Sequence, residues 1–105
     1  MRLLSIAVLI LGSGSFAAQA ADAKAGQAVY DRHCKTCHGP NGAATPNMVK
    51  LASSRIPDLR GSSVQLSDAE LAKVVTGGKG KMRGDTTVKG KDLNDLVAFI
   101  RELKG

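Results

Sequence analysis

The chain has 105 residues, of which 15 are Lys or Arg and 9 are Asp or Glu, giving a formal net charge of +6 at pH 7. This length excludes more than one sizeable domain, and an aromatic content of 3% is too low for a core made of large side chains alone. The positive charge is compatible with three kinds of binding partner: nucleic acid, an anionic surface or an acidic protein. The N-terminal segment helps to choose among them.

The N-terminal segment has the organisation of a secretory leader. Arg2 precedes the apolar run LLSIAVLIL, and small residues then lead to the Ala-Gln-Ala that ends at Ala20. A membrane anchor is the rival interpretation, but the run is well short of the roughly 20 residues that span a bilayer. We expect a signal peptide over 1–20, cleaved after Ala20 or one residue later, and a periplasmic domain over 21–105 without a transmembrane segment. Export argues against nucleic acid and favours an acidic protein partner or an anionic surface.

The segment AGQAVYDRHC, from Ala25 to Cys34, predicts an amphipathic helix. Asp22 stands where it can cap the N-terminus of this helix. The residues expected to face the core are Ala25, Ala28, Val29 and Tyr30.

Both cysteines and both histidines of the chain lie together, because His33 precedes the sequence Cys-Lys-Thr-Cys-His at 34–38. A thioredoxin-like dithiol needs a strand–helix–strand frame that the sequence does not show, and a zinc site would have to take four ligands from one turn. Covalent haem attachment fits better, with the thiols of Cys34 and Cys37 adding to the haem vinyl groups and His38 becoming an axial iron ligand. A disulfide in an oxidising compartment is the remaining alternative. One covalent haem c would also supply the large apolar body that the composition lacks.

The stretch from 39 to 61 is rich in Gly, Pro, Asn and Ser, which predicts a loop with a short helical turn around 48–52. An axial histidine needs a hydrogen-bond acceptor for its second ring nitrogen. In the sequence RIPDLRG, Pro57 either supplies that carbonyl or merely turns the chain.

The sequence LSDAELAKVVTGG predicts the next helix. Ser67 and Glu70 have the spacing of a capping box, and Gly77 or Gly78 is expected to end the helix.

Met82 is the predicted second axial ligand, although Met48, His33 and several lysines are also candidates. His33 directly precedes the first cysteine, so it cannot reach the far face of the ring and is expected on the surface. Met48 follows the attachment motif closely and is expected to make core or surface contacts. Met82 lies in GGKGKMRG, within a glycine- and lysine-rich loop that runs to about Lys91 and is long enough to pass the haem edge. Its polar neighbours argue against a simple apolar filler.

The last segment, DLNDLVAFIREL, predicts an amphipathic helix. One of its faces carries Leu93, Leu96, Val97, Ile100 and Leu103. Because no stretch alternates convincingly as a strand, the fold class predicted is all-α.

The segments AGQAVYDRHCKTCHGPNG, IPDLRG, GGKGKM and DLVAFIREL together resemble a class I cytochrome c of the small soluble bacterial kind. The resemblance extends over nearly the whole mature chain. It implies the cytochrome c fold, with three to four helices around one covalently attached haem. It also implies a close crossing of the first and last helices, at positions that correspond here to Gly26, Tyr30, Leu96 and Phe99.

In the terms of that family, Pro57 supplies its carbonyl to the axial histidine and Leu59 packs on the haem ring. The chain departs from the pattern in three places: a longer loop before Pro57, no tryptophan near a haem propionate, and Gly80 where some relatives place a threonine near the methionine sulfur. Arg55 and Arg60 are then candidate propionate partners.

The function expected is that of a monomeric one-electron carrier, not an enzyme, whose exposed lysines face redox proteins with an acidic docking face. Six strong ligands leave no open iron position for a substrate. Two alternatives are a haem subunit of a larger periplasmic oxidoreductase and a five-coordinate domain that binds gases or acts on peroxide.

Overall fold

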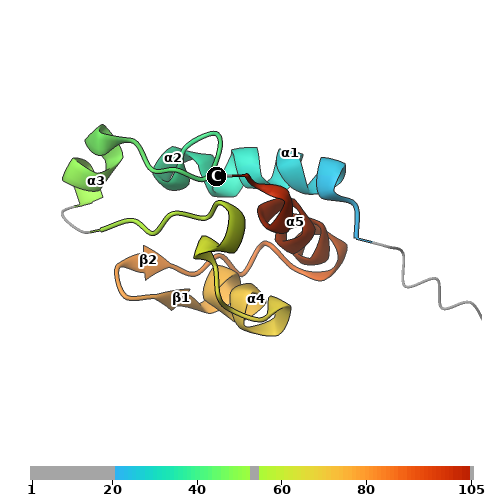
Figure 1. Cartoon of the computed structure of the whole chain (residues 1–105). Helices are drawn as coiled ribbons and strands as arrows, with labels where there is room; N and C mark the ends of the chain where they lie inside the picture. Colours follow the sequence, from blue (N-terminus) through green and yellow to red (C-terminus); the bar gives the residue numbers. More distant parts are fainter. Residues whose placement is uncertain (1–20, 53–54, 105) are drawn as a thin grey trace, which may run out of the picture.

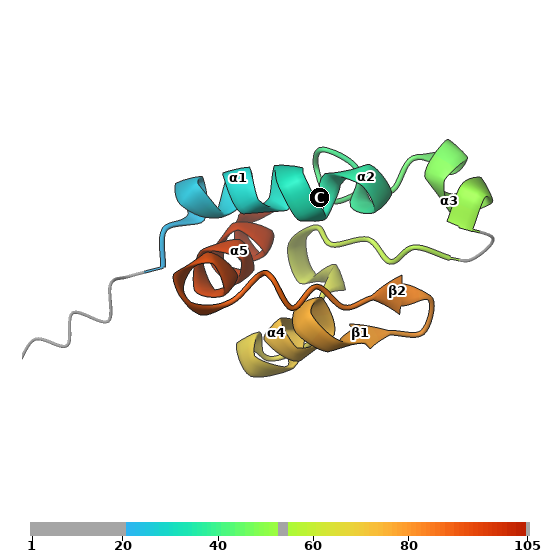
Figure 2. The same cartoon turned by 180° about the vertical axis from the view of Figure 1, so that it is seen from behind.

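A computed structural model of the chain describes residues 21–52 and 55–104. The signal peptide predicted over 1–20 lies outside these residues. Within the described ranges, no helix is both long enough and apolar enough to cross a bilayer. Figures 1 and 2 show the order of the elements along the chain, which is α1 (Ala23–His33), α2 (Lys35–His38), α3 (Pro46–Ala52), η1 (Gly61–Ser63), α4 (Asp68–Gly77), β1 (Gly78–Lys79), β2 (Met82–Arg83) and α5 (Gly90–Glu102).

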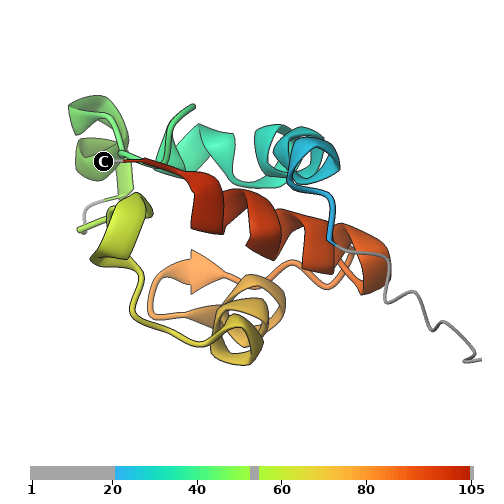
Figure 3. The same ribbon diagram turned by 45° about the vertical axis from the view of Figure 1, so that its right-hand side comes forward.

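The first and last helices, α1 and α5, pack directly against each other (Figure 3). Gly26 makes their close approach possible, because a Cβ atom at this position would lie 1.9 Å from the backbone oxygen of Asp95. Beside this contact the rings of Tyr30 and Phe99 meet at a centroid distance of 5.1 Å with an interplanar angle of 53°. The crossing predicted from the resemblance is therefore confirmed.

The core lies between α1, α4 and α5. Its buried apolar residues are Val29, Tyr30, Leu71, Val75, Val88, Leu96, Val97, Ile100 and Leu103. Most of the predicted apolar face of α5 is in this set, while Leu93 and Phe99 are partly buried against it. The fold class is all-α, as predicted, since helices make up nearly all the regular structure of the described residues.

Local signals in the sequence set the helix ends. The side chain of Asp22 accepts hydrogen bonds from the backbone N–H groups of residues 24 and 25 at the start of α1. At the start of α4, Ser67 and Glu70 form the predicted capping box, each accepting a hydrogen bond from the other's backbone N–H. The turn expected around 48–52 is the helix α3, which begins two residues earlier at Pro46.

Two details of the prediction are wrong. Ala28 is exposed rather than part of the core. The close contact at Gly26 turns the face at 26, 29 and 30 toward α5, and a residue two positions after Gly26 lies about 200° around the helix, on the opposite side.

The second difference is a small antiparallel ladder where only loop was expected. β1 and β2 pair Gly78 with Arg83 and Lys79 with Met82. Gly78 has φ +80°, and a Cβ there would lie 2.5 Å from the backbone oxygen of Met82, so the turn depends on glycine at this position. Strands of two residues are too short for alternation of apolar and polar residues to reveal them.

Candidate functional site

The attachment motif interrupts the helical path between α1 and α2. Cys34 lies between the two helices with φ −120° and ψ −31°, and its carbonyl accepts hydrogen bonds from the N–H groups of Cys37 (3.2 Å) and His38 (2.9 Å). The turn therefore carries both thiols and the imidazole on one short stretch. Cys34 is half-buried and Cys37 is exposed, and both are free thiols.

The two thiols lie in different environments. Burial, reinforced by the nearby Asp85 carboxylate and by the neighbouring Cys37, raises the pKa of the Cys34 thiol to about 11. A thiol held protonated in this way is a weak nucleophile and a weak ligand for metal ions.

His38 is the one histidine whose side chain enters the interior, with 9% of the residue exposed. Burial lowers the pKa of its imidazole, and interaction with the backbone of Pro57 acts in the opposite direction. Its Nδ1 atom is nevertheless buried without a hydrogen-bond partner in the described part of the chain. The contact with Pro57 therefore falls short of hydrogen-bond geometry, although it brings that backbone to the ring.

The loop after His38 is bound to both the core and the segment that carries Pro57. The buried hydroxyl of Tyr30 donates a hydrogen bond of 2.6 Å to the carbonyl of Gly39. Further along, the N–H of Leu59 donates to the carbonyl of Gly42 at 3.0 Å. Gly42 has φ +86°, and a Cβ there would meet Leu103 and Leu59 side-chain atoms at 2.9 and 3.2 Å. These contacts hold Leu59, which is half-buried, near the attachment motif.

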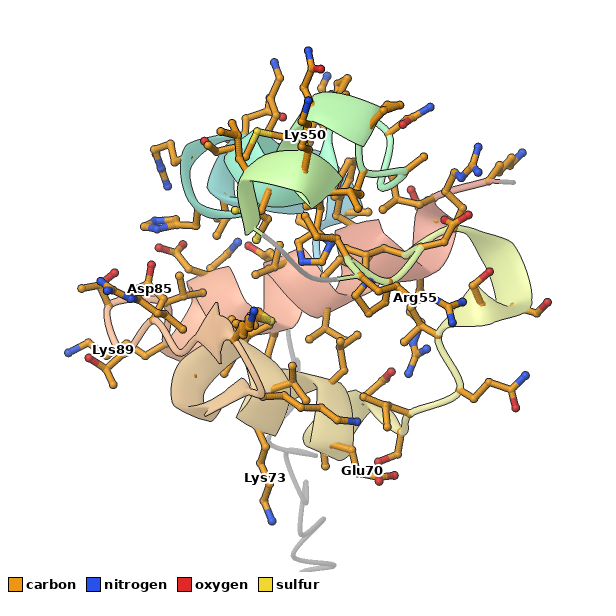
Figure 4. The ribbon with its side chains drawn as sticks, turned by 90° about the vertical axis from the view of Figure 1, so that its left-hand side faces the viewer. Lys50, Arg55, Glu70, Lys73, Asp85 and Lys89 are labelled. Carbon is orange, nitrogen blue, oxygen red and sulfur yellow. The ribbon has the colours of Figure 1, made fainter. Side chains whose placement is uncertain are left out.

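The two arginines considered for the propionates differ in their surroundings. The guanidinium of Arg60 donates two hydrogen bonds to Asp58, at 3.0 and 2.8 Å. This pairing, with the backbone N–H of Arg60, holds the pKa of Asp58 at about 2. Arg55 is exposed, and Figure 4 shows it on the segment between α3 and η1.

Met82 lies on β2, and 36% of the residue is exposed. Figures 1 and 4 show β2 and α4 on one side of the molecule and α2 and α3 on the other. His38 and Met82 therefore belong to opposite sides. Met48, the other methionine among the described residues, is half-buried on α3.

The partner of His33 could not be identified from the sequence. The Nδ1 of His33 lies 2.7 Å from a carboxylate oxygen of Asp85, so this surface histidine joins the end of α1 to the segment after β2. The only local signal was the spacing Asp85-Thr-Thr87, which is typical of an aspartate that accepts hydrogen bonds two residues ahead. Nothing in the sequence indicates that Asp85 pairs with His33, which lies 52 positions earlier (85 − 33).

The residues present fit a covalently attached haem. They offer two free thiols on one turn, a buried imidazole with an unpartnered nitrogen, and a thioether exposed to solvent. In the described part of the chain, no three His, Cys, Asp or Glu side chains gather in a way that could hold a metal ion.

Comparison with known proteins gives the family. Residues 21–100 match the family model described as "Cytochrome C oxidase, cbb3-type, subunit III". The solved structure "KustC0563 c-type cytochrome" is similar over 76% of this chain and 98% of its own, with 25% sequence identity and a TM-score of 0.59. No match was found among curated proteins. The chain therefore belongs to the cytochrome c family whose model is described as cbb3-type oxidase subunit III, and with it to the proteins that bind haem c covalently and use its iron for electron transfer.

Proposed function

We propose that this chain is an exported one-electron carrier of the periplasm, with haem c attached through Cys34 and Cys37 and its iron ligated by His38 and Met82. The observation that carries the proposal is the imidazole of His38, buried directly after the two thiols with its Nδ1 beside the backbone of Pro57. With Nδ1 on the Pro57 side, Nε2 is the nitrogen left to ligate iron, and a ring held on both nitrogens in this way avoids the cost of burying an unpartnered polar group.

Haem c, when bound, supplies an iron that alternates between the ferric and ferrous states. The role of His38 is to offer its Nε2 lone pair, with Nδ1–H directed to the Pro57 carbonyl so that the tautomer and the ring orientation are set. Burial, which keeps the imidazole neutral, favours this role. Leu59 contributes an apolar wall beside the ring.

Met82 offers a neutral thioether from the opposite side of the molecule. Such a ligand favours ferrous iron and raises the reduction potential relative to two histidines. If His38 and Met82 both ligated the iron, they would leave no coordination position for a substrate. This is the reason for proposing electron transfer rather than an enzymatic reaction.

The ligand assignment is tested by comparing Met82→Ala with Met48→Ala. The first substitution should abolish the weak sulfur-to-iron band of the ferric protein and allow CO to bind the ferrous protein. The second should do neither, although both remove a methionine side chain. The reverse result would show that Met48 is the ligand, and a wild-type protein that binds CO would favour the gas-binding or peroxidatic alternative.

The partner we propose is a redox protein with an acidic docking face. Lys35, Lys79 and Lys89 are exposed, and Figure 4 shows Lys50, Lys73 and Lys89 spread around the side of the molecule that carries β2 and α3. Lys91 contributes less to this field, because its ammonium is bonded to Asp95. Exposed charges of this kind act mainly on the rate of association and are screened beyond about 10 Å at 0.1 M salt.

Charge reversal tests the docking proposal. Lys79→Glu with Lys81→Glu should lower the bimolecular electron-transfer rate more than Lys24→Glu with Lys104→Glu, which changes the net charge equally at the terminal helices. Equal losses would mean that only net charge counts. A rate that does not change with salt would exclude electrostatic steering.

A second candidate function is that of a subunit in a larger oxidoreductase. It is favoured by the description of the matching family model, which names subunit III of a cbb3-type oxidase. Stable co-purification of the chain with membrane or periplasmic proteins from its own cells would support this role, whereas a monomer in solution would support the free carrier.

The leader is a proposal of its own. We propose that residues 1–20 are removed on export and that 21–105 form the mature domain, as the start of the family match at residue 21 suggests. N-terminal sequencing of the periplasmic protein tests this, and a first residue of Ala21 or Asp22 is the expected result.

A further inference from the structure

The contact between the side chains of His33 and Asp85 connects the two parts of the proposed haem site. His33 stands directly before Cys34 in the attachment motif, and Asp85 follows Met82 by three residues, a span of at most about 11 Å of chain. The contact of 2.7 Å between them therefore joins the segment that holds haem covalently to the segment that offers the second axial ligand. The side chains are 29% and 35% exposed, which shields the pair partly from solvent.

Asp85 itself is firmly held. Its backbone N–H donates to the carbonyl of Val75 on α4 at 2.8 Å, and its carbonyl accepts from the N–H of Val88 at 3.4 Å. One carboxylate oxygen accepts hydrogen bonds from both the N–H and the hydroxyl of Thr87, while the other faces His33. The hydrogen bonds from Thr87 and the neighbouring His33 keep the pKa of Asp85 below its ordinary value, so the carboxylate is negatively charged at neutral pH.

Packing alone does not position Met82. Residues 82–84 are all exposed, and the ladder that contains Met82 is only two residues long on each strand. Ladders this short are marginal in water. Gly84 packs closely on the end of α4, where an added Cβ would lie 2.4 Å from the backbone oxygen of Thr76. Asp85 directly follows Gly84, and its side chain contacts His33 at the end of α1.

We propose that His33 and Asp85 form a clasp that positions the Met82 segment for iron ligation, an inference that rests on Met82 being the axial ligand proposed above. Neither residue touches the iron, and both act through the segment between Asp85 and Met82. Because the backbone of Asp85 is bonded to Val75 on α4, loss of the clasp would leave this segment attached to α4 but would remove its link to the end of α1 beside the attachment motif. The distance between the two parts of the site could then vary more, which would favour dissociation of the sulfur.

Imidazole binding to the ferric holoprotein tests the clasp, because imidazole must displace Met82 to reach the iron. His33→Ala leaves the hydrogen bonds between Asp85 and Thr87 intact. Asp85→Asn keeps an acceptor for Thr87 while it removes the charge. Each substitution should tighten imidazole binding about fivefold, and the double variant should show about the same fivefold gain, because the pair acts as a unit. The sulfur-to-iron band should weaken at the same time.

A matched control is Asp68→Asn, which breaks another partly exposed ion pair, that of Asp68 with Arg101 at 2.9 Å on α4 and α5. It should leave imidazole affinity unchanged. The clasp is overturned if His33→Ala and Asp85→Asn also leave the imidazole affinity unchanged, even if they lower the stability of the fold. It is also overturned if the effects of the two substitutions multiply to about 25-fold in the double variant. If Asp85→Asn does not fold, His33→Ala decides alone.

The same titration separates this inference from the ligand assignment. The ligand assignment fails, and the clasp fails with it, if the wild-type protein lacks the sulfur band and Met82→Ala binds imidazole with the same affinity as wild type. A wild-type protein with the sulfur band, together with clasp variants that behave like wild type, overturns the clasp only.

Discussion

Replacing Gly26 with alanine tests the crossing of α1 and α5 that supports the attachment motif. The new Cβ would lie 1.9 Å from the backbone oxygen and 2.4 Å from the backbone carbon of Asp95. Both atoms belong to the main chain of a helix, so no side-chain rotation can relieve the overlap. To reach even a tight 3.0 Å, the helices must separate by about 1.1 Å (3.0 − 1.9).

The cost can be worked from the side chains at the crossing. A gap of this size forfeits a quarter to a half of the contact energy of the residues that face it. Val29 and Tyr30 of α1 and Leu96 and Ile100 of α5 are buried side chains of the core that the two helices share. At about 2 kcal/mol each, they would lose about 2 to 4 kcal/mol in total. Alanine regains about 1 kcal/mol through helix propensity, which leaves a net loss of about 1 to 3 kcal/mol.

Denaturant unfolding of the holoprotein, followed by circular dichroism, measures this loss. The matched control is Gly77→Ala at the end of α4, where a Cβ would meet no atom within 4 Å. There the free energy of unfolding should stay the same or rise by up to about 1 kcal/mol. Equal effects of the two substitutions would refute the crossing as the source of the cost.

Three further predictions concern the haem, a buried hydroxyl and acid stability. Cys34→Ala with Cys37→Ala should give a largely unfolded chain, because haem supplies much of the buried apolar area, and full helicity of this variant by circular dichroism would contradict this. Tyr30→Phe leaves a buried loop carbonyl without its 2.6 Å hydrogen bond and should lower the free energy of unfolding by about 1 to 3 kcal/mol. The Lys91 ammonium, with a backbone N–H, holds the pKa of Asp95 in the folded protein below its ordinary 3.8. The ionised carboxylate of Asp95 therefore stabilises the fold above pH 3.8, and this stabilisation is lost as the pH falls through the lower pKa of the folded state. The free energy of unfolding should therefore depend less on pH in Asp95→Asn than in wild type across this acid range. Equal pH dependence in the two proteins would show that Asp95 does not contribute to acid sensitivity.

The structural features that depend on residues close together in the sequence could be predicted. The cap at Asp22, the box of Ser67 with Glu70 and the apolar face of α5 each follow from contacts within one or two helical turns. The attachment motif is local in the same sense, since Cys34 and His38 bond within one turn. For this reason the predicted helices agree with the structure.

Features that depend on distant residues were not predictable. The exposure of Ala28 follows from which face of α1 meets α5, and periodicity alone left that rotation uncertain by one residue. The short ladder at Met82 depends on the positive φ of Gly78 and on backbone contacts with α4. His33 and Asp85 pair because tertiary packing brings the end of α1 beside the segment after β2, and the local sequence around either residue does not indicate the other.

The optical spectrum of the wild-type holoprotein in both oxidation states tests directly whether His38 and Met82 ligate one covalently bound haem. If they do, we expect a low-spin haem c in both states, a weak sulfur-to-iron band toward the red in the ferric protein, and no reaction of the ferrous protein with CO. A ferrous protein that binds CO readily, together with a ferric spectrum without the sulfur band, would contradict it.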